Sequence, residues 1–113
     1  MLGWTIAVMQ MAPEAAGQRR SREQTQAVML AYWEAGVLGL RWLEPLMAKG
    51  QVTQVHSGGY PDRYSAQAEH LLPLLRQDDW TPPEVRGEVA RSHEHLAACP
   101  ETATLTIEVW DQS

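Results

Sequence analysis

His95 and Cys99 are the two residues whose types and spacing come closest to a metal site. They are four positions apart, so on a helix they would share a face, and an imidazole beside a thiolate suits zinc. His93 is two positions from His95, roughly 200° around a helix, and would point away from the same ion. The missing ligands would have to be His56, His70 or carboxylates elsewhere. Two interpretations stay open: a metal site using His95 and Cys99, or an exposed polar helix end with a half-buried cysteine.

Cys99 is a poor candidate for a catalytic nucleophile. It falls at the predicted end of a helix, where the negative end of the helix dipole disfavours a thiolate. The chain also lacks the GxGxxG and GKS/GKT patterns of nucleotide-binding loops. The sequence therefore predicts no catalytic residue and no cofactor.

The segment Ser57–Tyr64 carries the side chains best suited to binding. Its paired glycines allow close approach of another backbone. Tyr60 and Tyr64 offer large amphipathic surfaces and Arg63 a planar donor, and both residue types are enriched at binding hot spots. In the alternative interpretation the segment is an ordered turn, in which the tyrosines pack on the domain and Asp62 accepts hydrogen bonds from backbone amides.

Charge is distributed unevenly along the chain. The net charge is −5, with +1 on residues 1–50 and −6 on residues 51–113. An acidic half repels phosphate backbones, so nucleic acid is not expected as a ligand. The short basic run Arg19–Arg22 is expected to be a solvated linker, with a phosphate contact as the alternative. Acidic side chains in the second half could instead steer a basic protein partner. Those proposed for this role are Asp78, Asp79, Glu88 and Glu94.

Five tryptophans and no phenylalanine make tryptophan the main bulky apolar residue. Trp33 and Trp42 are expected in the core. Trp110 falls on the opposite face of the last strand from its aliphatic residues. If that face is open, it exposes an aromatic patch of the kind that marks interfaces. A helix covering the face is the alternative.

Hydrophobic periodicity and capping signals predict seven elements. Ser21 and Gln24 form a capping box at the start of one helix, and Thr81 and Glu84, with proline between them, form another. The expected strands span residues 4–9, 51–56 and 103–110, and the expected helices span residues 21–35, 40–49, 65–75 and 81–98.

These elements predict a single α+β domain over residues 1–113. Its order is β-α-α-β-α-α-β, with a small, mainly antiparallel three-stranded sheet packed with about four helices. The terminal strands are expected to be adjacent, because chain ends in compact domains often lie close together. One cysteine and the lack of a run of ~20 apolar residues predict a cytoplasmic protein without a membrane contact.

The function that fits this pattern best is a small acidic, non-enzymatic protein-binding domain. It would occlude a partner with the 60–64 loop and its acidic C-terminal half, as an inhibitor such as a toxin-immunity protein, an antitoxin or a phage anti-defence protein would. One alternative is a small metal-assisted enzyme built on the histidines and the cysteine. Another is a homo-oligomeric structural subunit, such as a homodimer, formed through an edge strand or the tryptophan face.

Overall fold

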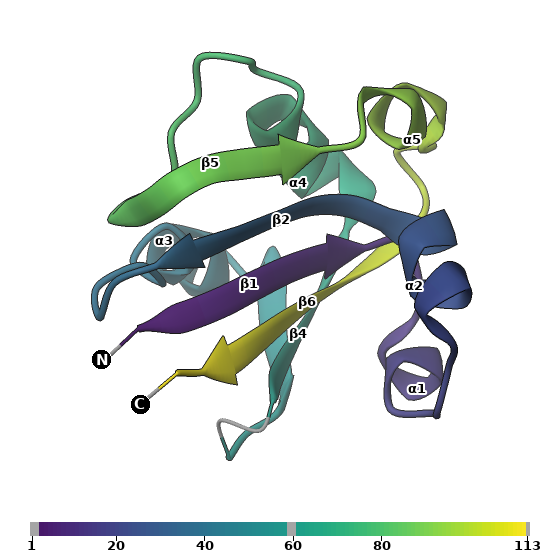
Figure 1. The fold of residues 1–113 in the computed structure, drawn as a ribbon, viewed down its shortest axis with the longest axis horizontal. Helices are drawn as coiled ribbons and strands as arrows, with labels where there is room; N and C mark the ends of the chain where they lie inside the picture. The colour runs from purple at the N-terminus through teal and green to yellow at the C-terminus, as the bar shows by residue number, and fades with distance from the viewer. Residues whose placement is uncertain (1–2, 59–60, 113) are drawn as a thin grey trace.

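The first and last strands of the chain lie side by side at the centre of the sheet (Figure 1). The computed structural model describes residues 3–58 and 61–112. Strands β1 (Trp4–Met9) and β6 (Thr104–Asp111) pair antiparallel along their lengths. Their positions and their adjacency are confirmed. The first and last strands are therefore the two central strands of the sheet.

The sheet is larger than the sequence predicts. Within the described ranges it has six strands, every neighbouring pair antiparallel, in the order β3-β4-β6-β1-β2-β5. The α+β class and the antiparallel pairing are confirmed, but the prediction of three strands is wrong. The strand predicted over residues 51–56 is confirmed as β3 (Val52–His56). The strands that were not predicted are β2 (Met29–Ala35), β4 (Asp62–Gln67) and β5 (Val85–Arg91).

The predicted helix over residues 21–35 divides into a helix and a strand. Its capping box is confirmed: the Gln24 amide donates to Ser21 Oγ at 3.1 Å, and the Ser21 amide donates to Gln24 Oε1 at 2.8 Å. Helix α2 (Arg22–Val28) then ends, and the chain continues as β2. Ala31 and Ala35 are four apart, a spacing that fits one face of a helix and equally one face of a strand. Antiparallel pairing with β1 stabilises this segment as a strand.

The predicted helix over residues 81–98 is wrong in its first half. Glu84 has a positive φ of 51° and Gly87 one of 77°, and neither conformation continues a helix. The Glu84 carboxylate accepts a hydrogen bond from the Leu38 amide at 2.7 Å instead of closing a capping box. The segment pairs with β2 as β5, and only α5 (His93–Ala98) remains helical.

The predicted binding loop also becomes partly strand. β4 includes Asp62 and Tyr64, and it continues through Ser65, which was expected to cap a helix. Helix α4 (Ala68–Leu75) starts directly after β4. Pro45 lies in the first turn of α3 (Leu43–Ala48), as expected for a proline in a helix.

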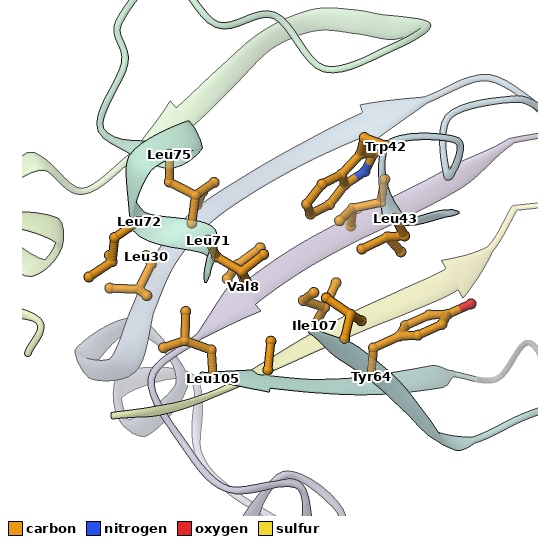
Figure 2. Close-up of a cluster of buried hydrophobic side chains, with 14 of the residues drawn as sticks. Val8, Leu30, Trp42, Leu43, Tyr64, Leu71, Leu72, Leu75, Leu105 and Ile107 are labelled. Carbon is orange, nitrogen blue, oxygen red and sulfur yellow. The ribbon is translucent and has the colours of Figure 1, made fainter. Parts of the chain in front are cut away.

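One face of the sheet carries the hydrophobic core. Helices α3 and α4 lie behind the sheet in Figure 1, against the face of Ile6, Val8 and Ile107. Figure 2 shows the α4 leucines gathered with side chains from the central strands. Trp33, Trp42 and Trp80 extend this core, with ring centroids 5.6–6.1 Å apart. Among the residues described, none of the helices has the length and apolarity needed to cross a membrane.

Candidate functional site

The residues predicted to form a binding loop are divided between the surface and the core. Tyr60 lies outside the described residues. Asp62 and Arg63 are half-buried on β4, and Tyr64 packs in the core, as Figure 2 shows. Burial raises the pKa of the Tyr64 phenol, and the nearby Asp62 carboxylate raises it further. Tyr64 thus has little surface to offer a partner.

The acidic residues predicted to face a basic partner are exposed, but they lie far from that loop. Asp78, Asp79 and Glu94 are exposed near α5, where Asp78 lies 3.8 Å from His93, and Glu88 is exposed on β5. The loop joins β3 and β4 at the opposite edge of the sheet. Five strand spacings separate the two edges, about 24 Å at 4.8 Å each. The structure does not bring the two groups into one site.

Of the two metal-ligand candidates, His95 contacts a backbone carbonyl and Cys99 is buried. His95 Nδ1 lies 2.9 Å from the Met29 carbonyl oxygen. Cys99 is buried beyond the end of α5, and burial raises the pKa of its thiol although Arg76 opposes the shift. In the part of the chain that is described, no group of three or more histidine, cysteine or acidic side chains could hold a metal ion.

The face of the sheet opposite the core is covered at one end only. In Figure 1, α1 (Pro13–Ala16) and α2 stand at the end where β1 finishes. Met9 and Thr106 are buried there, and the Thr106 hydroxyl donates to the Met11 carbonyl at 2.8 Å. Away from this end, no helix of the described chain lies in front of β1, β2 and β6 in Figure 1. Of the two alternatives for the face that carries Trp110, the structure therefore favours the open one: no helix of the described chain covers Trp110.

Two aromatic side chains flank the central strand on this uncovered surface. Tyr32 is 42% exposed and Trp110 is 41% exposed. The register places Tyr32 beside Ala7 and Trp110 beside Thr5, and both of these small residues are buried. The small, buried side chains between them leave the two aromatic rings standing out from the sheet. We call this surface, formed by Thr5, Ala7, Tyr32, Glu34 and Trp110, the open face.

A buried carboxylate holds two arginines beside the open face. Glu108 is 5% exposed and lies opposite Arg63 in the β4–β6 register. Arg63 Nε donates to Glu108 Oε2 at 3.0 Å, and Arg20 Nη2 lies 3.3 Å from Glu108 Oε1. Arg20 comes from the connection between α1 and α2, which it anchors by donating to the Ala16 carbonyl at 2.8 Å and to Thr25 Oγ1 at 3.0 Å. The two ion pairs thus link the connection between α1 and α2 to strands β4 and β6.

The same cluster lines a shallow pocket of about 440 Å³ at the edge of the open face. We call it the Arg63 pocket. Its lining includes Gly17, Arg19, Arg20, Arg63, Glu108 and Trp110.

The sequence alone identifies only part of this site. It predicts Trp110 as an exposed aromatic if its face is open, and Arg63 as a binding residue within a loop. It misses Tyr32, because the helix prediction places that residue on a buried helical face. Glu108 carries a usable signal, since it shares a face with Thr106 and Trp110 in the most regular strand of the chain. Its arginine partners are distant in sequence, and no local signal links them.

Comparisons of the chain with protein-family models, with curated proteins and with solved structures find no match. Function is therefore inferred from the geometry of the site.

Proposed function

We propose that this chain is a small non-enzymatic protein-binding domain that contacts a partner protein through its open face. The observation that carries the proposal is the exposure of Trp110 and Tyr32 on a helix-free surface of the central strands. Tryptophan and tyrosine are enriched among the residues that supply most of the binding energy at interfaces. Exposed apolar surface rimmed by polar groups is typical of contact sites.

The open face is also rigid enough to act as a contact surface. Its residues lie on β1, β2 and β6, three neighbouring strands at or next to the centre of the sheet. The backbones of Trp110 and Tyr32 are fixed in paired strands, so binding has to order only their side chains. A flexible loop would lose backbone freedom on binding as well.

The proposed partner is a protein that offers an apolar recess for Trp110 and carries a net positive charge. The net charge of −5 would attract such a partner over long range, while the aromatic surface would make the close contact. A cytoplasmic inhibitor, such as an immunity protein, an antitoxin or a phage anti-defence protein, would act in this way by covering a functional surface of its target.

Self-association through strand edges is the less favoured alternative. Both edge pairings contain register shifts, between Gln54 and His56 opposite β4 and between Tyr32 and Glu34 opposite β5. Irregularities of this kind are devices that discourage edge-to-edge pairing. A second copy on the open face would be a different form of self-association, and crosslinks between two copies of the chain would detect it.

Site-specific photo-crosslinking in cells that naturally encode the protein tests the proposal. The photoreactive residue p-benzoylphenylalanine replaces Tyr32 or Trp110 in one set of variants, and Val55 or Asp79 in a control set. We expect one protein other than the chain itself to crosslink from positions 32 and 110 and not from position 55. The proposal would be refuted if positions 32 and 110 gave no crosslinks, or if crosslinks formed from position 79 alone. Crosslinks to a second copy of the chain would also refute it.

A further inference from the structure

The Arg63 guanidinium uses only part of its hydrogen-bonding capacity on the described residues. Its Nε donates to Glu108, and its side chain is 17% exposed. Within residues 3–58 and 61–112, neither of its terminal nitrogens has a hydrogen-bond partner. A Cβ added to Gly17 would lie 3.9 Å from one of these nitrogens, which places that nitrogen against the pocket lining. Toward the described residues, four N–H groups of this mostly buried cation are thus unpaired.

Glu108 holds this guanidinium in place without competing for its outer edge. One carboxylate oxygen of Glu108 faces Arg20 and the other faces the Nε of Arg63. Arg20 is itself fixed by Ala16 and Thr25, so the carboxylate has a defined position. The terminal nitrogens of Arg63 are therefore oriented before any ligand arrives, which lowers the cost of binding.

The charge of the pocket is opposite to that of the whole chain. Arg19, Arg20 and Arg63 line it together with one carboxylate, a surplus of two positive charges in a chain whose net charge is −5. A local surplus of this sign favours an anion.

We infer that the Arg63 pocket is a carboxylate-binding site. Resting on the proposed function, the inference is that it receives an aspartate or glutamate side chain, or the terminal carboxylate, of the partner protein. The two free terminal nitrogens present parallel N–H donors that match a planar carboxylate in a bidentate pair. One fork pairs with two oxygens, which is the number that a carboxylate has, whereas a phosphate group has further oxygens that this fork leaves without donors. Trp110 forms one side of the pocket, so an apolar contact and an ion pair would be made together.

Nuclear magnetic resonance of the isolated full-length chain tests the site without the partner. Sodium acetate is the probe, and sodium chloride keeps the ionic strength constant. We expect saturable shifts of the Arg63 side-chain N–H signals and of the Trp110 indole N–H, the latter assigned with a Trp110→Phe variant. Arg63→Gln should weaken the acetate affinity at least tenfold by the Trp110 signal, and Arg63→Lys, which keeps the charge but not the fork, should weaken it by a similar factor.

Control variants distinguish acetate binding in the Arg63 pocket from a general attraction of acetate to arginine. Arg41→Gln removes an exposed arginine elsewhere and should leave the acetate affinity within twofold of the unmodified protein. Thermal unfolding of each variant verifies that it is folded. If Arg63→Gln does not fold, Arg19→Gln replaces it as a variant of the same pocket. No saturable shift with acetate, or a tenfold tighter affinity for inorganic phosphate, would overturn the inference. Neither result would affect crosslinking from positions 32 and 110, so the proposed function is judged separately.

Discussion

Glu108 illustrates how one buried side chain on this sheet can link separate parts of the fold. A carboxylate that is 5% exposed is costly to bury unless charged partners compensate, and Arg20 and Arg63 supply that compensation. The pair formed with Arg63 is local to two neighbouring strands, whereas the pair formed with Arg20 fixes the connection between α1 and α2. The same contacts leave the terminal nitrogens of Arg63 without a partner among the described residues.

Tyr64 provides a residue-scale prediction about alkaline pH. Burial and Asp62 raise its pKa in the folded protein above the ordinary value of 10.0, which the unfolded chain should show. Above pH 10 the unfolded state then releases a proton that the folded state keeps, so the free energy of unfolding falls as pH rises toward the folded pKa. Tyr64→Phe should reduce this fall, as measured by urea unfolding at pH 9 and at pH 11.

The matched control for this prediction is Tyr32→Phe, which changes an exposed tyrosine on the open face. Its pH dependence should follow that of the unmodified protein. If the free energy of unfolding fell equally between pH 9 and pH 11 in Tyr64→Phe and in the unmodified protein, Tyr64 would not contribute to the pH dependence.

At the scale of elements, regular alternation predicts strands better than helical spacing predicts helices. The predicted bounds of β1 and β6 agree with the structure to within one residue at each end. The alternation is stricter in β6, where aliphatic residues alternate with threonine, glutamate and tryptophan. The helices predicted in place of β2 and β5 are wrong, because apolar residues four apart occupy one face in either structure. The positive φ of Glu84 and the pairing of β2 with β1 depend on distant contacts, so neither is encoded in a short window.

The contact between Glu84 and the turn after β2 gives an element-scale prediction. The Gly36 amide donates to the Glu84 carbonyl at 2.9 Å, and a Cβ on Gly36 would lie 2.8 Å from Glu84 Oε1. Because the added Cβ meets the end of a flexible side chain, Gly36→Ala should displace the Glu84 carboxylate from the Leu38 amide and lower the free energy of unfolding by about 0.5–1.5 kcal/mol. The cost should be smaller by at least about 0.5 kcal/mol when Glu84→Ala has already removed the carboxylate.

Gly39→Ala is the control for this double-mutant cycle. A Cβ on Gly39 would meet Ala35 and the Gly36 carbonyl, and Glu84 is not among its nearest neighbours. Its cost should be the same with and without Glu84→Ala. Additive effects of Gly36→Ala and Glu84→Ala in chemical denaturation would contradict the described contact.

At the scale of the whole molecule, the chain ends form the centre of the sheet. β6 pairs with β1 on one side and β4 on the other, and Ile107 and Leu105 are fully buried. The number and order of strands could not be predicted, because they depend on which strands meet across long sequence separations. The sequence therefore predicts the open face only as one of two alternatives, and it does not predict the Arg63 pocket.

Removing β6 should unfold the domain and not merely trim it. Deleting residues 104–113 exposes the paired edges of β1 and β4 and removes part of the core. We expect loss of cooperative thermal unfolding and of dispersed amide signals in the magnetic resonance spectrum. Deleting residues 112–113 is the control; it removes the hydrogen bond from the Gln112 amide to the Gly3 carbonyl and should preserve the fold. A cooperative transition in the longer deletion would contradict the central placement of β6.

The affinity of the crosslinked partner for defined variants tests the central claim most directly. Calorimetry with the purified partner compares Trp110→Ala with Val55→Ala, an exposed apolar residue on edge strand β3, and with the charge reversal Asp78→Lys/Asp79→Lys. We predict that Trp110→Ala weakens binding at least tenfold, about 1.4 kcal/mol, while Val55→Ala changes it less than twofold. Unchanged affinity for Trp110→Ala, together with a large loss on charge reversal, would contradict binding through the open face.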